Sequence, residues 1–187
     1  RAVMAGETET GMTIMRVEHR MDAGPMLLQR GCPIRPEDDT GSLQDRLAAL
    51  GAEALLEGLR TLESGGGCWI PQDESRATLA PKIVDADCRL TLAEHPSQLV
   101  NRIRGLSPAP GAYLRLPDGK RLRVLRAMAA PGCAPPGVIL QSDEDGLVLG
   151  TGGGALALME VQPEGKRRMT GAEFARGQRL PPGARCA

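Results

Sequence analysis

Residues 7–29 of the chain read ETETGMTIMRVEHRMDAGPMLLQ, and this stretch decides how the first part folds. Apolar runs at residues 12–17 and 26–34 are typical of two β-strands, and the charged segment between them is typical of a loop. The loop ends in Asp22-Ala23-Gly24-Pro25, so one acidic residue lies in a tight turn between the strands. An Asp before Gly-Pro is a common turn former, so Asp22 alone can be a turn residue or a functional acid.

A long helix is predicted after the two strands. Apolar side chains recur at helical spacing over residues 42–62, and the three glycines at residues 65–67 end the pattern. Ser42, with Asp45 three positions later, is predicted to cap the start of this helix. Two strands and one helix cannot enclose a core. We therefore expect residues 1–68 to be an α/β remnant, the closing part of a larger α/β domain.

The composition is that of an ordinary soluble protein. Of the 187 residues, 41% are hydrophobic and 25% are charged, and no run approaches the roughly 18 apolar residues of a membrane-spanning helix. The five cysteines are far apart and no histidine lies near them at ligand spacing, which argues against a metal site and favours reduced thiols in the cytoplasm. The chain opens with Arg1 and shows no signal-peptide pattern, so we expect a fragment of a longer protein.

The second part of the chain has a different pattern. Prolines and polar residues predict a linker over residues 69–87, and a short helix is predicted at residues 96–106. Short strands separated by turn residues then follow, which is typical of a small all-β, OB-like barrel within a second domain at residues 88–187. The predicted strands span residues 112–116, 121–129, 137–142, 147–151 and 156–161, and a final helix spans residues 170–177.

The net charge of zero conceals an asymmetry. Residues 1–86 carry nine Lys and Arg against 14 Asp and Glu, whereas residues 87–187 carry 14 against nine. The basic excess predicts a polyanionic partner for the second part, bound through phosphates more than through bases, although a solvated basic surface is the alternative. The candidate phosphate-binding residues are Arg102, Arg104, Lys120, Arg121, Arg123, Lys166, Arg167 and Arg168.

Three segments in the right order and spacing together resemble the folate-dependent formyltransferases. The first is TETGMTIM with MDAGPMLLQ, near the start of the chain. The second is GLSPAPGA at residues 105–112, which is similar to that family's Asn-Pro-x-Pro-Gly-Ala junction. The third is VQPEGKRRM at residues 161–169, which is similar to its Leu-Gln-Pro-x-Gly-Lys-Lys-x-Met segment. The resemblance extends over residues 1–183 and is greatest to the branch that acts on methionyl-tRNA.

The resemblance implies that residues 1–68 are the end of a mononucleotide-fold formyltransferase domain. It implies transfer of a formyl group from 10-formyltetrahydrofolate to the amino group of initiator methionyl-tRNA, with a tRNA-binding role for residues 88–187. It implies that Asp22 is catalytic, orienting a histidine and relaying a proton, while an asparagine and that histidine stabilise the oxyanion. The family's folate pocket uses the same turn, so the resemblance also implies donor contacts, mainly through backbone groups. The residues concerned are His19, Arg20, Met21 and Gly24.

Two departures from the family pattern matter. The asparagine and histidine lie upstream in the family and have no counterpart in this sequence, so we expect the chain to be inactive alone. Pro25 stands where the branch that acts on methionyl-tRNA usually has Asp. The Asp-x-Gly-Pro sequence of this chain is more similar to the purine-pathway formyltransferases. The alternatives are a formyltransferase acting on a nucleotide-sugar amine and a non-catalytic RNA-binding module. We expect a cytoplasmic monomer that makes no membrane contact and needs no metal.

Overall fold

The computed structural model describes residues 1–178 and 180–187, and its contacts divide the chain into two compact units. One unit is formed by residues 7–81, and the other by residues 1–6 together with residues 82–187. The first six residues thus pack with the second part of the chain, which their sequence position does not suggest. The division of the chain at residues 68 and 87 stays a prediction.

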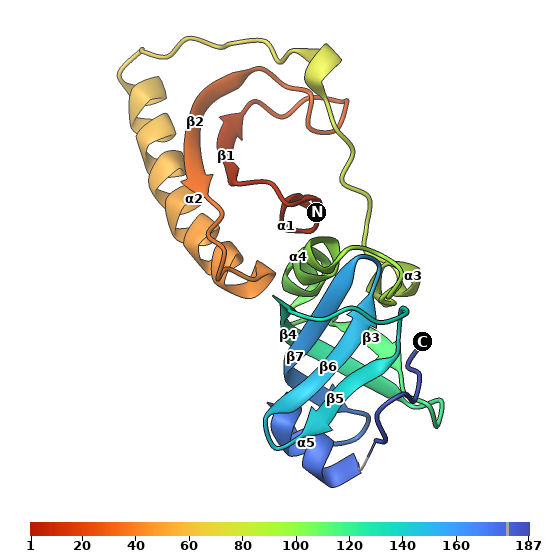
Figure 1. The fold of residues 1–187 in the computed structure, drawn as a ribbon. Helices are drawn as coiled ribbons and strands as arrows, with labels where there is room; N and C mark the ends of the chain where they lie inside the picture. The colour runs from red at the N-terminus through yellow and green to blue at the C-terminus, as the bar shows by residue number, and fades with distance from the viewer. Residues whose placement is uncertain (179) are drawn as a thin grey trace. The chain divides into compact units, whose positions relative to one another are not determined.

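The unit of residues 7–81 is a β-hairpin covered by one helix. Strands β1 (Glu9–Met15) and β2 (Met26–Pro33) pair antiparallel, with Gly11 opposite Gly31, and helix α2 (Thr40–Glu63) lies along the hairpin (Figure 1). The helix approaches closely at Gly58, where a Cβ would come within 3.3 Å of Ile14 Cγ2. The two predicted strands and the predicted helix are therefore present.

The cap of α2 differs from the sequence prediction. The N-cap is Asp39, whose carboxylate accepts a hydrogen bond from the Ser42 amide at 2.8 Å, while the Ser42 hydroxyl accepts one from the Asp39 amide at 3.1 Å. Ser42 is thus the third residue of a capping box, and the prediction that it is the cap was wrong. The helix starts earlier because Asp39 has the extended backbone that an N-cap requires.

The apolar face of α2 is only partly covered in the described unit. Leu43 and Ala54 are buried, as predicted for residues that face the hairpin. The side chains toward the end of the helix remain 40–55% exposed. These exposed residues are Leu55, Leu56, Leu59 and Leu62. Their helical spacing predicted the helix correctly, but spacing alone does not tell whether a face is buried.

The other unit contains four short helices and a sheet in the residues that the structure describes. Helix α1 (Ala2–Ala5) packs on α4 (Pro96–Leu106) at Gly105, where any Cβ would overlap Met4. Arg1 reaches Asp87 of α3 (Asp85–Cys88) in an ion pair of 2.8 Å and keeps the pKa of that carboxyl below its ordinary value. The predicted helix at residues 96–106 is present with the same bounds.

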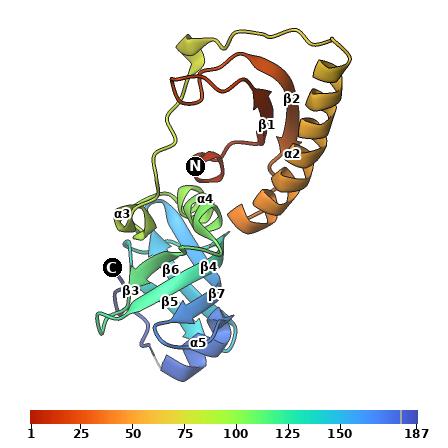
Figure 2. The ribbon, with the colours of Figure 1, turned by 180° about the vertical axis from the view of Figure 1, so that it is seen from behind.

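The described part of this unit contains a six-stranded sheet. Its strands are β3 (Ala112–Arg115), β4 (Arg121–Ala130), β5 (Ile139–Asp143), β6 (Gly146–Thr151), β7 (Gly154–Pro163) and β8 (Met169–Thr170). They pair antiparallel, and the main path has the order β3-β4-β7-β6-β5 (Figure 2). Strand β8 pairs with β7. Helix α5 (Gly171–Gln178) contacts β5, β6 and β7. Leucines fill much of the core beside Phe174.

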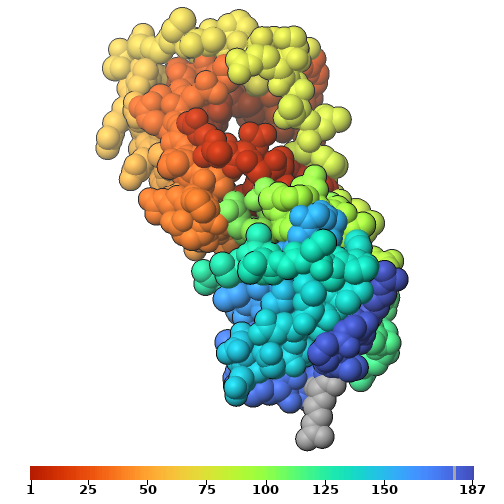
Figure 3. Space-filling view, viewed as in Figure 1, coloured from red at the N-terminus to blue at the C-terminus, as the bar shows by residue number. Residues whose placement is uncertain are grey.

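The strand pairing does not confirm the predicted OB-like barrel. In the described residues β3 and β5 are the two edges of the sheet and do not pair with each other. The segment after α5 hydrogen bonds to both edges instead: the Ala187 amide donates to Arg115 O at 2.8 Å, and the Ile139 amide donates to Ala184 O at 2.9 Å. In Figure 3 this segment, in dark blue, lies against the surface of the sheet. The backbone after α5 thus pairs with groups of both edge strands that would otherwise be open to another strand.

Candidate functional site

The loop between β1 and β2 has a shape that its sequence dictates. The Arg16 amide donates to Pro25 O at 3.0 Å across the neck of the loop. Gly24 is buried directly beneath this neck, and any Cβ at that position would overlap Arg16 O. Asp22 at the apex has a left-handed backbone with φ of 56°, the only non-glycine positive φ among the described residues. Such strained backbone in a loop often marks a functional position.

The side chains of this loop point outward. Asp22 is exposed, and within residues 1–178 and 180–187 its carboxylate has no hydrogen-bond or ion-pair partner. Two apolar side chains of the same loop are almost fully exposed, Val17 at 89% and Met21, the residue before Asp22, at 86%. An exposed carboxylate with apolar neighbours can accept a proton or orient a cationic or N–H group of a bound molecule.

The predicted donor-binding residues do not all behave alike. His19 and Met21 are exposed on the outer side of the loop, as a ligand-contacting role requires. Arg20 is engaged with Glu74 at 2.6 Å, and this hydrogen bond raises the pKa of its guanidinium. Gly24 is buried and shapes the loop from below. Among the residues that the structure describes, the loop therefore offers the exposed side chains of His19 and Met21, and that of Arg20 only if its ion pair opens.

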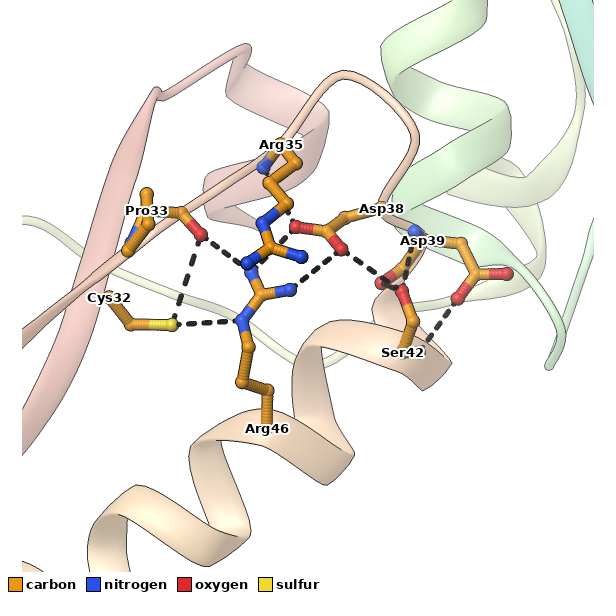
Figure 4. Close-up of polar contacts among 7 residues, drawn as sticks. All are labelled: Cys32, Pro33, Arg35, Asp38, Asp39, Ser42 and Arg46. Atoms are coloured by element: carbon orange, nitrogen blue, oxygen red, sulfur yellow. Dashed lines mark hydrogen bonds and ion pairs between the residues drawn. The ribbon is translucent and has the colours of Figure 1, made fainter.

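A buried polar cluster missed by the sequence prediction lies where β2 leads to α2 (Figure 4). The guanidinium of Arg46 donates to both oxygens of Asp38, to the carbonyl of Pro33 and to the thiol sulfur of Cys32, the last at 3.3 Å. The Arg35 amide adds a hydrogen bond of 2.7 Å to Asp38. This cluster ties the helix start to the strand end and so supports the hairpin that carries Asp22.

Most of the predicted phosphate-binding cations form ion pairs. Arg102 pairs with Glu94 at 3.0 Å and Arg121 pairs with Asp85 at 3.1 Å, while Arg121 also lies 4.2 Å from the ring centroid of Tyr113. The remaining pairs are Lys120–Asp118 at 2.8 Å, Arg167–Glu173 at 3.2 Å and Arg168–Glu160 at 4.0 Å. These pairs are partly exposed, so a phosphate can displace the carboxylate at small cost. Arg104 is half-buried on α4.

Arg123 is engaged differently from the others. Its guanidinium donates to Pro108 O at 3.1 Å, to Pro110 O at 2.6 Å and to Gln162 Oε1 at 3.0 Å. The Gln162 amide in turn donates to Lys166 O at 3.0 Å. Arg123 thereby joins the Pro-Ala-Pro turn to the turn before Lys166, two motifs that are some 50 residues apart in the sequence.

Lys166 and Arg167 line a surface cavity of about 370 Å³ beside α5. Arg176, a cation that the sequence analysis did not single out, lines the same cavity together with Glu173 and Phe174. In the described residues no ion pair involves Lys166 or Arg176. The cavity therefore presents two unpaired cations that can meet an anion.

Two other kinds of site are absent from the part of the chain that the structure describes. No group of three or more His, Cys, Asp or Glu side chains in the described residues is arranged to hold a metal ion. No helix in the same part of the chain is long and apolar enough to cross a membrane.

Burial raises the pKa of the Cys186 thiol to about 11, so this buried cysteine is a poor nucleophile near neutral pH.

Two family profiles match the chain. The profile described as "Formyl transferase" matches residues 1–59, and the one described as "Formyl transferase, C-terminal domain" matches residues 82–179. The methionyl-tRNA formyltransferase of Methylobacterium sp. (strain 4-46) is 44% identical over 190 residues, which cover 100% of this chain and 60% of the relative. That of Geobacter metallireducens is 40% identical, covering 96% of this chain and 58% of the relative. The chain thus spans about 60% of the length of these relatives.

Solved structures share the fold. HypX from Aquifex aeolicus in complex with tetrahydrofolic acid aligns with a TM-score of 0.68 at 23% identity, covering 92% of this chain and 31% of HypX. WlaRD, a sugar 3N-formyl transferase, aligns with a TM-score of 0.66 at 15% identity, covering 89% of this chain and 59% of its own. A methionyl-tRNA formyltransferase from Clostridium thermocellum aligns with a TM-score of 0.54 at 13% identity, covering 87% and 59%. At these identities the likeness concerns the fold alone.

Proposed function

The chain belongs to the formyl transferase family, and we propose on this premise that it is part of an enzyme that formylates initiator methionyl-tRNA with 10-formyltetrahydrofolate as the donor. The observation that carries the proposal is the 44% identity to a methionyl-tRNA formyltransferase over the entire chain. The sugar formyltransferase shares the fold at only 15% identity, so it gives no comparable support for a sugar acceptor.

Asp22 is the proposed catalytic residue of this chain. When bound, the donor supplies a formyl group on N10 that the acceptor amine can attack. A bond forms between the amine nitrogen and the formyl carbon, the bond from that carbon to N10 breaks, and the amine proton ends on N10. The exposed Asp22 carboxylate is suited to hold the amine and to take its proton in passing, because nothing else in the described residues occupies it.

Asp22 needs partners that its own unit does not provide. The resemblance implies an asparagine and a histidine beside the aspartate. Asn101, the only asparagine in the sequence, belongs to the other unit, and His19 lies in the same loop as Asp22. We therefore propose the activity for a chain of the relatives' length and not for these 187 residues alone.

The donor is proposed to lie against the outer side of the Asp22 loop. The exposed Met21 side chain offers an apolar surface for a flat ring system, and His19 and Arg20 offer polar contacts at its edge. Gly24 contributes indirectly, because its lack of a Cβ permits the tight neck of the loop. These residues fit a donor that combines an aromatic ring with polar groups.

Residues 88–187 are proposed to hold the tRNA through its phosphates. Lys166 and Arg176 are unpaired in the described residues, and the ion-paired cations around them can exchange a carboxylate for a phosphate. We propose that the sheet and the segment on its edges act as an OB-like domain, that residues 1–68 belong to the catalytic domain and that residues 69–87 link the two. We also propose that the enzyme is a cytoplasmic monomer.

A chimera tests this function. In it, residues 1–187 replace the matching part of the Methylobacterium sp. (strain 4-46) relative, and formylation of methionyl-tRNA and of a nucleotide-linked amino sugar is measured side by side. We expect formyl-methionyl-tRNA at a rate close to that of the unaltered relative, and no formylated sugar. Formylation of the sugar but not of the tRNA would assign the chain to the sugar branch. No formylation of either acceptor would leave residues 1–187 without the proposed role.

A further inference from the structure

We propose that Gln72 is a positioning residue of the formyl-transfer site, holding the backbone on which Asp22 is presented. This inference rests on the proposed role of Asp22. Gln72 lies in the segment that the sequence pattern assigns to a linker, about 50 residues after the loop. Its position in the chain therefore gives no hint of a role in the site.

The contacts of Gln72 bracket the apex of the loop. Its side-chain amide nitrogen donates to Asp22 O at 2.8 Å and to Gly24 O at 2.7 Å. The same nitrogen lies 3.7 Å from the sulfur of Met15, at the end of β1. One NH₂ group thus satisfies two carbonyls on either side of Ala23, which uses both of its hydrogens.

The backbone around Gln72 is held to both ends of the loop. Ile70 and Met26 exchange two backbone hydrogen bonds of 2.8 Å each, so the segment extends the hairpin at the first residue of β2. The guanidinium of Arg16, just after β1, lies 5.5 Å from the ring centroid of Trp69. We call residues 69–72 the strap, because they join the two ends of the loop and place the Gln72 amide beneath its apex.

The loop depends on the strap because its own restraints are few. Asp22 has a left-handed backbone, which is unfavourable for a residue with a side chain. Beyond the paired strands, one backbone hydrogen bond in the described part of the chain closes the neck, from the Arg16 amide to Pro25 O. Fixing the carbonyl of Asp22 fixes its ψ and, together with φ, the direction of its Cα–Cβ bond. Gln72 therefore acts through Asp22 without touching a substrate.

Gln72→Glu tests the role most directly. It keeps the size and shape of the side chain but replaces the NH₂ donor by an oxygen, which cannot donate to the carbonyls of Asp22 and Gly24. Gln72→Lys keeps a donor with three hydrogens and serves as the rescue variant. Gln29→Glu is the matched control, because Gln29 is an exposed residue of the same hairpin whose amide donates to Thr13 Oγ1 at 3.3 Å, away from the loop.

The first measurement uses residues 1–187 and does not depend on activity. The backbone NMR shifts of Asp22 should leave the left-handed range in Gln72→Glu and stay there in Gln72→Lys. The shifts of Gly24, whose carbonyl accepts the second hydrogen bond, should move in Gln72→Glu and not in Gln72→Lys. Both residues should be unaffected in Gln29→Glu. Thermal unfolding of each variant distinguishes a local change from loss of the fold. Unchanged Asp22 and Gly24 shifts in a folded Gln72→Glu protein would overturn the proposal, whatever the enzyme does.

The second measurement uses the chimera. Gln72→Glu should lower kcat by roughly 10- to 100-fold with little change in the KM for methionyl-tRNA, as expected when a reacting group is misplaced. Gln72→Lys should recover part of the rate, and Gln29→Glu should equal the unsubstituted chimera. Equal kcat values in Gln72→Glu and Gln29→Glu would overturn the positioning role. An inactive unsubstituted chimera would refute the proposed function instead, and the NMR comparison would still decide whether Gln72 shapes the loop.

Discussion

The guanidinium of Arg46 donates to both carboxylate oxygens of Asp38, at 2.9 and 2.6 Å. Only 4% of the surface of Asp38 is exposed, and its hydrogen bonds to Arg46 lower its pKa from 3.8 to about 2. A buried carboxylate with this geometry stays ionised because its partner is fixed on the adjacent helix (Figure 4). The pair thus joins the segment between β2 and α2 to the helix, which packs on the hairpin of the candidate site.

The pH dependence of stability should report this pair. Because the folded pKa of Asp38 lies below the unfolded value, the pair stabilises the fold above about pH 4, and this contribution is lost as the pH falls toward 2. Asp38→Asn should lower the free energy of unfolding by about 2 kcal/mol at pH 7 and by much less at pH 2 to 3. Urea unfolding at both pH values measures this, with the exposed Asp45→Asn as control. A pH-independent difference would contradict the assignment.

Gly24→Ala should disrupt the candidate site from below. A Cβ there would overlap Arg16 O, which is backbone and cannot rotate away, so the neck of the loop must open. We expect destabilisation of about 1–3 kcal/mol and loss of formylation by the chimera. Gly177→Ala is a control that should change stability in the opposite direction. Gly177 lies in helix α5 and nothing lies within 4 Å of the added Cβ, so the alanine should stabilise the fold slightly. A stable, active Gly24→Ala chimera would show that the neck is not required.

Substitution of Arg123 distinguishes a structural role of this side chain from a direct contact with tRNA. Arg123→Lys cannot reproduce the three hydrogen bonds to Pro108, Pro110 and Gln162, so it should lower the free energy of unfolding by about 2 kcal/mol. Arg126→Ala, an exposed neighbour on the same strand, should be close to neutral. Chemical denaturation measures both. If Arg123→Lys weakened tRNA binding in low salt but left stability intact, Arg123 would be a phosphate contact after all.

The salt dependence of tRNA binding should distinguish unpaired from ion-paired cations. The logarithm of the tRNA association constant falls linearly with the logarithm of the salt concentration. Lys166→Ala should make this slope shallower by about 1, as the loss of one phosphate contact does. Lys120→Ala should have a smaller effect, because Asp118 already neutralises that ammonium group and raises its pKa. Fluorescence titrations of labelled tRNA at several salt concentrations give both slopes. Equal slopes for Lys166→Ala and the unsubstituted chain would remove Lys166 from the interface.

Much of the fold could be predicted from local pattern, because the hairpin strands and α4 carry clear alternation or helical spacing. The start of α2 was predicted less well, since both Asp39 and Ser42 are good capping residues and only the backbone conformation at Asp39 decides between them. The edge segment at residues 183–187 carries no strand pattern. Its place depends on hydrogen bonds to residues more than 40 positions away.

The candidate site could be predicted at Asp22 but not in its surroundings. Motif spacing locates the loop, whereas the Gln72 contacts depend on how a proline-rich segment folds back onto it. The pairing of Arg121 with Asp85 likewise joins residues 36 positions apart that no periodicity connects. A count of basic residues therefore overstates how many cations are free to meet a phosphate.

Asp22→Asn in the chimera tests the central claim most directly. The substitution keeps the shape of the side chain and the left-handed backbone, which Asn tolerates as well as Asp, but removes the negative charge and most of the basicity. We expect kcat for formylation of methionyl-tRNA to fall by roughly 100-fold or more, with tRNA affinity unchanged. A kcat that stays within about twofold of the unsubstituted chimera would contradict a catalytic role and leave Asp22 as a turn residue.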